Sequence, residues 1–384
     1  MIGDWNYPTR VVFGPGRLSE LPRLCRSLGM SNPLLITDSD LVELDIVEDA
    51  LRINRHAQLD TGVFSGVQGN PIGENVASGT LAYTAGSHDG VIAFGGGSAL
   101  DVGKAVAMLI GQTRPLWDFE DVGGNYKRID ERKMAPVVAV PTTSGTGSEV
   151  GRASVIIDET NHTKRIIFHP AMMPKYVICD PALTIGLPAS VTAWTGMDAL
   201  SHCLEAYCVD SFHPQADGIA MQGIALVGRA LRRAVADGSD IQARSNMMAA
   251  SLMGATAFQK GLGAMHAMSH PIGAIFNTHH GLTNAVVMPY VLLANRSAIE
   301  DKIVDIARLL ALPPPTFSGF MEWILRLRET LEIPHTLDRL GVAADTAVDI
   351  AQKAHSDSCA GGNPIPFTVT QYAGLLRAAI SGSL

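Results

Sequence analysis

The chain contains few cysteines and few charged residues, and it lacks any cluster of Lys and Arg. Its five cysteines are an odd number without a CxxC pair, so we expect reduced thiols rather than a disulfide framework. The net charge is −8, which argues against a partner that is itself a polyanion. The sequence therefore predicts a protein without a nucleic-acid partner.

Long apolar runs are also missing. No segment approaches the length of a membrane span. The opening MIGDWNYPTR has neither the basic lead nor the apolar stretch of a signal peptide. We therefore expect a cytoplasmic protein that does not associate with a membrane.

The rest of the composition is that of a globular protein, with 47% hydrophobic and 17% charged residues over 384 positions. Single hydrophobic cores stop growing below this length, so two domains are expected. Short β-branched runs alternate with helical stretches at first, and from about Pro188 long helical segments rich in Ala, Met and Leu replace them. We predict an α/β domain over residues 1–187 and an all-α domain over residues 188–384.

Three expected strands of the first domain end in glycine or polar residues. They are residues 33–36 (PLLI), followed by Thr37 and Asp38; residues 91–94 (VIAF), followed by GGGS; and residues 136–140 (PVVAV), followed by PTTSGTGS. Open α/β sheets bind their ligands at the carboxyl ends of parallel strands. We expect the three strand ends to line one crevice.

The glycine-rich loop at residues 95–98 suits a ligand that carries phosphates. Glycines let the backbone approach closely, and Ser98 can cap a helix whose amides face the phosphates. Asp38 can accept a hydrogen bond from a ribose 2′-hydroxyl and would repel a 2′-phosphate, which favours NAD over NADP. In the regular dinucleotide fingerprint the acidic residue follows the glycines, whereas here Asp38 precedes them. Taken alone, each feature also fits an ordinary turn.

The second domain carries a carboxylate and histidines at helical spacing. Asp198 and His202 are four residues apart, Glu205 continues the same face, and His266 and His270 repeat the spacing. Several imidazoles with one carboxylate form a donor set for divalent iron, zinc or cobalt rather than for calcium or magnesium. The chain is therefore expected to bind a metal ion.

The helical pattern predicts one helix from Met253 to His270, which Pro271 would end or kink. His279 and His280 follow, and only one of them is expected to face the metal because neighbouring side chains diverge by about 100°. A later loop, HSDSCAGGNPIPFT, carries Cys359, and its composition fits either an active-site flap or a surface connection.

Five motifs together resemble the iron-containing (group III) alcohol dehydrogenase family. They are GGGSALDVGK, PTTSGTGSEV, GMDALSHCLEAY, GLGAMHAMSHPIGA and NTHHGLTNAVVMP, and the similarity runs from Pro8 to Pro364. The resemblance implies the dehydroquinate synthase-like fold of that family, with an N-terminal α/β nucleotide-binding domain and an all-α C-terminal metal-binding domain. It also implies a homodimer or a larger homo-oligomer.

The resemblance assigns roles to individual residues. The implied metal ligands are Asp198, His202, His266 and His280, and His270 is implied as the catalytic residue that relays a proton. The implied nucleotide-binding residues are Asp38, Asn70, Gly97, Ser98, Asp101, Thr142, Thr143, Thr146, Ser148 and Lys164. The implied cofactors are NAD and Fe²⁺, with Zn²⁺ as an alternative because these ligands accept both metals.

The activity that the resemblance implies is the interconversion of a primary alcohol and its aldehyde by hydride transfer. One alternative is a dehydroquinate synthase-like lyase, although its phosphate-binding basic cluster is not apparent here. Another is a metal-independent reductase of the maleylacetate reductase type, which the intact metal set disfavours. A metal-storing or structural protein would leave the two glycine-rich loops unexplained.

Arg152, Lys260 and Cys359 are candidates for contacting the substrate. Arg152 follows the TTSGTGSEV loop, and Lys260 precedes the GLGAMH segment. Cations beside an apolar cleft are costly unless something balances them, and arginine binds a carboxylate bidentately. We therefore expect a short hydroxy acid and its semialdehyde as substrates. The alternative for both cations is a contact with solvent or with a cofactor phosphate.

Overall fold

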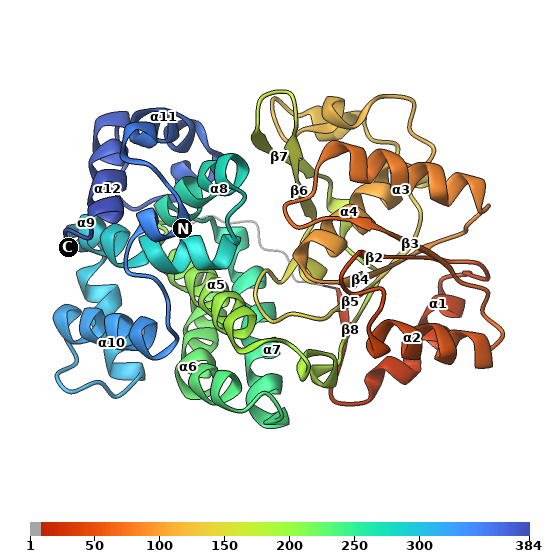
Figure 1. The fold of residues 1–384 in the computed structure, drawn as a ribbon, viewed down its shortest axis with the longest axis horizontal. Coiled ribbons are helices and arrows are strands. Elements are labelled where there is room, and N and C mark those ends of the chain that lie inside the picture. The colour runs from red at the N-terminus through yellow and green to blue at the C-terminus, as the bar shows by residue number, and fades with distance from the viewer. Residues whose placement is uncertain (1–8) are drawn as a thin grey trace. The chain divides into compact units, whose positions relative to one another are not determined.

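The computed structural model describes residues 9–384. The first eight residues, including Pro8 and most of the segment that bears on a signal peptide, lie outside the described part. The described chain divides into two compact units. One comprises residues 9–143 and 147–185, and the other comprises Ser144–Thr146 and Gly186–Leu384. In Figure 1 the first unit runs from red to yellow, and the second continues through green to blue.

The first unit is built on a parallel six-stranded sheet with the strand order β1-β8-β5-β4-β2-β3. Its strands are β1 (Arg10–Phe13), β2 (Leu34–Asp38), β3 (Gly62–Val67), β4 (Val91–Gly95), β5 (Val137–Pro141) and β8 (Tyr176–Cys179). The helices of this unit are α1 (Leu21–Ser27), α2 (Asp45–His56), α3 (Gly73–Ala85) and α4 (Gly97–Leu109). Every residue of β4 and β5 is buried, as expected for central strands covered by helices on both faces.

The three strands singled out in the sequence are neighbours in this sheet. β4 pairs with β2 on one side and with β5 on the other, and all three run parallel. Their carboxyl ends therefore meet at one edge of the sheet, next to one another. A separate antiparallel hairpin, β6 (Ala153–Asp158) and β7 (Thr163–Phe168), is joined to this unit where the Ile157 amide donates to the Pro71 carbonyl (2.8 Å).

The second unit is helical, which confirms the predicted fold class of an α/β region followed by an all-α region. Its helices are α5 (Ala189–Cys208), α6 (Pro214–Ala236), α7 (Ile241–Ala257), α8 (Ala264–Phe276), α9 (His280–Leu309), α10 (Phe317–Thr330), α11 (Ala347–Ser356) and α12 (Val369–Ser381). Helix α5 packs against α6, α7 and α9, and most of its residues are buried. A helix that is covered on all sides holds polar side chains only where they have partners.

The expectation of one helix from Met253 to His270 is wrong. Helix α7 ends at Ala257, and α8 begins only at Ala264. Gly261 between them has a φ of 127°, which no helix allows and which favours glycine. Pro271 does not end the second helix, because α8 continues for five residues beyond it to Phe276. Proline removes one backbone hydrogen bond there without stopping the helix.

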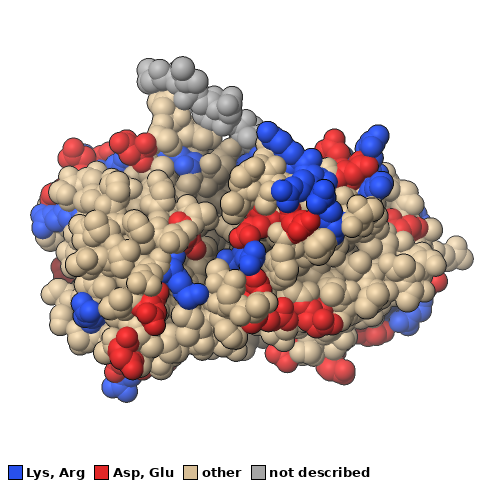
Figure 2. Space-filling model, turned by 90° about the horizontal axis from the view of Figure 1, so that it is seen from above, with Lys and Arg blue, Asp and Glu red and all other residues tan. Residues whose placement is uncertain are grey.

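Within residues 9–384, no helix is both long enough and apolar enough to cross a membrane. On the face in Figure 2, Lys and Arg side chains are interspersed with Asp and Glu, and most of the surface is neither. Some of the exposed charges form ion pairs along a helix, such as Arg296 with Glu300 on α9 (2.8 Å). Such exposed pairs each contribute about 1 kcal/mol or less to stability.

Candidate active site

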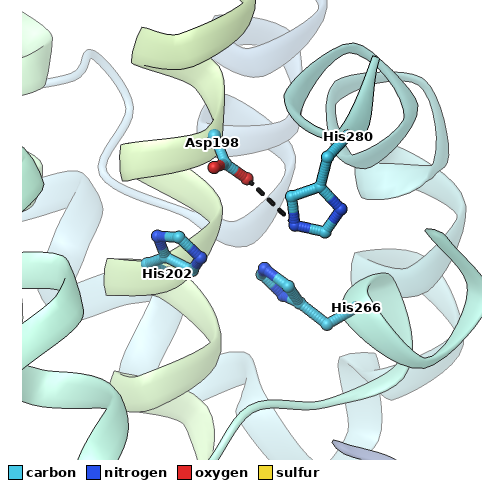
Figure 3. A group of neighbouring side chains, drawn as sticks. All are labelled: Asp198, His202, His266 and His280. Atoms are coloured by element: carbon cyan, nitrogen blue, oxygen red, sulfur yellow. Dashed lines mark ion pairs between the residues drawn. The ribbon is translucent and has the colours of Figure 1, made fainter. Parts of the chain in front are cut away.

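Four side chains from α5, α8 and α9 converge in the helical unit (Figure 3). Asp198 and His202 project from one face of α5, His266 comes from the first turn of α8, and His280 is the first residue of α9. One carboxylate oxygen and one ring nitrogen from each histidine lie within 4.8 Å of one another. The structure therefore brings together all four of the residues that the sequence suggested as metal ligands.

The cluster is almost closed to solvent. Asp198, His202 and His266 are at most 4% exposed, and only His280 is partly accessible. Burial lowers the pKa of His202 to about 4, so its ring is neutral at physiological pH and one of its two nitrogens has a lone pair for a metal. Neutral imidazoles and one carboxylate are the donor types that divalent iron and zinc prefer.

Two further polar residues support the cluster, and sequence reasoning gave neither a role. Glu205 on α5 lies 2.6 Å from His266 Nδ1. Burial lowers the pKa of His266, but the hydrogen bond and charge of Glu205 outweigh it and leave that pKa raised. Asn284 Nδ2 donates to Asp198 Oδ1 (2.9 Å) and lies 3.2 Å from Nε2 of both His266 and His280. The sequence signal for each residue is its helical spacing from a proposed ligand. Glu205 lies three residues after His202, and Asn284 lies four residues after His280.

His270 stands beside the cluster with its own carboxylate partner. Its Nδ1 lies 2.9 Å from Asp357 Oδ2, and its ring stacks on that of His280 at 5.5 Å between centroids. Burial raises the pKa of Asp357, but the charge and hydrogen bond of His270 lower it further, so the net shift is downward. The Cys359 amide donates to the other Asp357 oxygen (2.8 Å). The loop that carries Cys359 therefore contacts the site through Asp357.

His279 has a different environment from its neighbour. Its Nδ1 accepts a hydrogen bond from the Leu282 amide (3.4 Å) at the start of α9, and its ring packs on Trp194 with 5.1 Å between centroids. His280 is the histidine that joins the cluster. This agrees with the expectation that only one of the two adjacent rings faces the common centre.

The glycine loop and Asp38 lie side by side in the α/β unit. Asp38 Oδ1 accepts from the amides of Asp40 (3.1 Å) and Leu41 (2.8 Å). Its Oδ2 faces Gly95, where an added Cβ would lie 3.5 Å from it. Burial raises the pKa of Asp38 although these amides oppose the shift. The carboxylate thus stands at the edge of the sheet beside the glycine loop, despite the unusual order of the two in the sequence.

The start of α4 differs from the expectation in one respect. The helix begins at Gly97, Gly96 is its N-cap, and no side chain caps it, so the expected cap at Ser98 is wrong. The helix starts before Ser98 because the glycines turn directly out of β4. A Cβ at Gly96 would lie 3.6 Å from Thr143 Oγ1, so the loop after β4 lies within contact distance of the loop after β5.

The loop after β5 also contains a buried hydroxyl without a partner. In residues 9–384, Thr142 Oγ1 has no hydrogen-bond partner.

Asp101 and Ser148 are held in a buried polar network. The Ser148 hydroxyl donates to Asp101, whose other oxygen accepts from the Val155 amide (2.9 Å). Lys104, only 1% exposed, donates to Ser148 Oγ (2.7 Å) and lies 3.3 Å from Asp101. These contacts join the loop that follows β5 to α4 and to the β6–β7 hairpin. Glu149 is buried beside them, and this burial raises its pKa to about 7.

The remaining nucleotide candidates are distributed over loops and the hairpin. Asn70 has a left-handed φ of 51° in the turn after β3. Lys164 on β7 pairs with Ile157, and Ile157 in turn bridges Ile72, so the hairpin carries Lys164 close to the segment that follows Asn70. Thr146 belongs to the short stretch that clusters with the helical unit.

The two candidate cations have different surroundings. The Lys260 side chain is 1% exposed, and its ammonium pairs with Asp217 (2.6 Å) and donates to the Tyr207 carbonyl (3.3 Å). These contacts balance its charge within the protein, so they do not favour a role in binding a substrate carboxylate. The Arg152 guanidinium lies over the Phe168 ring, 5.5 Å from its centroid. Across residues 9–384, no ion pair involves Arg152.

Comparisons with known proteins agree over nearly the whole chain. The family model described as iron-containing alcohol dehydrogenase matches residues 8–181, and its C-terminal counterpart matches residues 192–380. A 4-hydroxybutyrate dehydrogenase from Cupriavidus necator is 37% identical over 381 residues, which cover 97% of this chain and 98% of that protein.

Solved structures of related oxidoreductases match the fold of this chain over nearly its whole length. A 1,3-propanediol oxidoreductase is 34% identical with a TM-score of 0.93, and the match covers 99% of this chain and all of the other. A sulfoacetaldehyde reductase from Bifidobacterium kashiwanohense, solved in complex with NAD⁺, is 26% identical with a TM-score of 0.89 over 100% and 99% of the two chains. The chain therefore belongs to the iron-containing alcohol dehydrogenase family and is an oxidoreductase that interconverts an alcohol and its aldehyde.

Proposed function

We propose that this enzyme is a metal-dependent, NAD-linked dehydrogenase that oxidises a short hydroxy acid to its semialdehyde. The observation that carries the metal dependence is the convergence of three imidazoles and one carboxylate within 4.8 Å in a nearly closed site. The residues that would hold the ion are Asp198, His202, His266 and His280. When bound, NAD supplies the hydride acceptor and Fe²⁺ or Zn²⁺ supplies Lewis acidity toward the alcohol oxygen.

His270 is the residue that we assign to the proton. The pKa of Asp357 is lowered, so its carboxylate is ionised and accepts a hydrogen bond from His270 Nδ1 (2.9 Å). When the His270 ring is neutral, this contact places its hydrogen on Nδ1 and leaves Nε2 with the lone pair. Nε2 is then the atom that takes up the proton released when the alcohol is oxidised. The stacking of His270 on His280 supports this role because it holds the ring beside the proposed metal ligands.

The edge of the sheet is the proposed coenzyme site. Asp38 stands next to Gly95 and would accept from the ribose hydroxyls of NAD. The amides at the start of α4, from Gly97 and Ser98, would face the pyrophosphate. The buried Thr142 hydroxyl, which lacks a partner in the described chain, fits a contact with a bound ligand. The other residues proposed for the coenzyme are Asn70, Asp101, Thr143, Thr146, Ser148 and Lys164.

The proposed substrate class rests on Arg152. Its guanidinium packs on Phe168 and has no carboxylate partner among residues 9–384, so its charge is available for an anion. Two of the similar proteins are named for anionic substrates, 4-hydroxybutyrate and sulfoacetaldehyde. Lys260 is left out of this proposal because Asp217 already balances its charge. For Cys359, contact with the substrate stays a prediction.

The test is a comparison of charged and neutral alcohols after anaerobic reconstitution with Fe²⁺ or Zn²⁺. We expect NAD reduction with 4-hydroxybutyrate, and loss of both bound metal and turnover in His266→Ala. Arg152→Ala should raise KM for 4-hydroxybutyrate about tenfold or more and leave KM for 1-butanol unchanged, because it removes a charge-assisted hydrogen bond worth about 1.5 to 3 kcal/mol. An equal response of both substrates would refute the anion-binding role, and full metal content in His266→Ala would remove His266 from the ligand set.

We also propose Fe²⁺ as the metal, with Zn²⁺ as the alternative, and a homodimer or larger homo-oligomer. We further propose a cytoplasmic location, with residues 1–187 as the nucleotide-binding domain and residues 188–384 as the metal-binding and catalytic domain. Metal analysis of the protein as isolated and light scattering would decide the first two.

A further inference from the structure

Glu205 is a buried carboxylate that the proposed chemistry does not use. It lies on the same face of α5 as Asp198 and His202, and it is 5% exposed. Its Oε2 lies 2.6 Å from His266 Nδ1, and its Oε1 accepts from the Met265 amide at 2.7 Å. One carboxylate therefore joins the helix that supplies two proposed ligands to the first turn of the helix that supplies a third.

These contacts fix where the proton sits on the His266 ring. A carboxylate oxygen only accepts, so Nδ1 carries the hydrogen and donates to Glu205. The other side of the ring agrees, because Asn284 Nδ2, which only donates, lies 3.2 Å from His266 Nε2. Asn284 Nδ2 has only two hydrogens and also contacts Asp198 and His280, so the carboxylate contact is the stronger of the two observations. Both leave Nε2 with its lone pair, on the atom that belongs to the four-residue cluster.

The surroundings keep Glu205 in this position. An added Cβ at Gly263 would lie 2.9 Å from both Glu205 Oε1 and Asn363 Oδ1, so only glycine leaves room for the carboxylate there. Asn363 Oδ1 accepts from the Ala264 amide (3.1 Å), next to the amide that Glu205 binds. Two of the free amides at the start of α8, those of Ala264 and Met265, are thus satisfied by side chains, and a negative charge is favourable at this end of a helix.

We propose that Glu205 is a positioning residue that fixes the tautomer and the direction of the His266 ring, so that Nε2 is ready to bind the divalent metal. The inference rests on the proposed metal site. A histidine ligand whose far nitrogen donates to a carboxylate is held in one orientation and is a stronger base toward the metal. Glu205 is not one of the four proposed ligands, and it acts on the metal site through His266.

The substitution Glu205→Gln separates this role from simple packing. Glutamine has the same shape but offers one acceptor and one NH₂ group. If its oxygen accepts from the Met265 amide, its NH₂ faces His266 Nδ1 and the ring proton moves to Nε2, where it blocks the metal. If its oxygen accepts from His266 instead, two donors meet at Met265. Only a carboxylate satisfies both donors at once.

The first measurement needs no variant. Nitrogen-15 NMR of the metal-free protein at alkaline pH reports which ring nitrogen of His266 carries the hydrogen. We expect Nδ1–H in the wild-type protein, and Nε2–H there would overturn the proposal. In Glu205→Gln we expect the Nε2–H form to appear, and Zn²⁺ affinity, measured by competition with a chelator, to fall about 10- to 100-fold.

Two variants complete the experiment. Glu205→Asp keeps both acceptor oxygens on a shorter stem, so its Zn²⁺ affinity should lie between those of the wild type and Glu205→Gln. Glu300→Gln removes an exposed carboxylate on α9 and should leave Zn²⁺ affinity unchanged. Wild-type Zn²⁺ affinity and tautomer in Glu205→Gln would refute the positioning role, whereas a wild-type protein that binds no metal would refute the proposed function itself. If Glu205→Gln does not fold, the wild-type tautomer and Glu205→Asp decide the question.

Discussion

Gly281 offers a direct test of how closely the helices must approach at the site. It is the second residue of α9, directly after His280, and it faces the backbone of α5. An added Cβ at this position would lie 2.3 Å from the Trp194 carbonyl oxygen and 2.9 Å from Asp198 Cβ. Both neighbours belong to a buried helix, and a backbone carbonyl cannot rotate away as a flexible side chain does.

The substitution Gly281→Ala should therefore separate the two helices. An ordinary contact needs about 3.4 Å, so α9 must move by about 1 Å relative to α5. This displacement carries His280 away from Asp198, its partner in the cluster. Overpacking of this kind costs about 1 to 3 kcal/mol of stability, and a shift of about 1 Å in a reacting group lowers kcat about 100-fold.

The assay compares Zn²⁺ affinity and kcat for 4-hydroxybutyrate in Gly281→Ala with those in Gly218→Ala. Gly218 lies on the exposed side of α6, and an added Cβ there meets nothing within 4 Å. Alanine at that helical position should stabilise the protein by about 0.5 to 1 kcal/mol and leave catalysis unchanged. If Gly281→Ala kept wild-type metal affinity and kcat, the close approach of α9 to α5 would not be what holds His280 in place.

Two further predictions concern the α/β unit. Asp38→Gly should relax the coenzyme preference, raising kcat/KM with NADP about tenfold or more, because it removes the carboxylate that repels a 2′-phosphate; equal use of NADP by the unmodified enzyme would contradict this. Glu149→Gln should raise the stability at pH 8 by about 3 kcal/mol and change it little at pH 4.5. The folded-state pKa of Glu149 is raised to about 7 from an ordinary 4.5, so wild-type stability is complete below pH 4.5 and is lost as the pH rises through 7. Thermal melts of both proteins across this range would show parallel curves if the reasoning were wrong.

The sequence determined those parts of the site that depend on local geometry. Asp198 and His202 had to share a face of α5 because residues four apart are one helical turn apart, whatever the helix packs against. The ends of β2, β4 and β5 were likewise predictable, since buried parallel strands followed by glycine or polar residues bring their carboxyl ends to one edge. The family resemblance then supplied the pairing of distant motifs that local rules could not.

Tertiary structure alone decided which distant side chains became partners. Glu205 is 60 residues away from Met265, and no spacing rule connects them. Asp357 lies against His270 across 87 positions of sequence. Lys260 pairs with Asp217 across 43 positions, which is a carboxylate partner that the sequence did not predict. The break at Gly261 also needed the structure, because the apolar pattern continues through it while its φ of 127° does not fit a helix. Helical and strand periods are fixed by the backbone of neighbouring residues, whereas the partner of a buried charge is fixed by how whole helices pack.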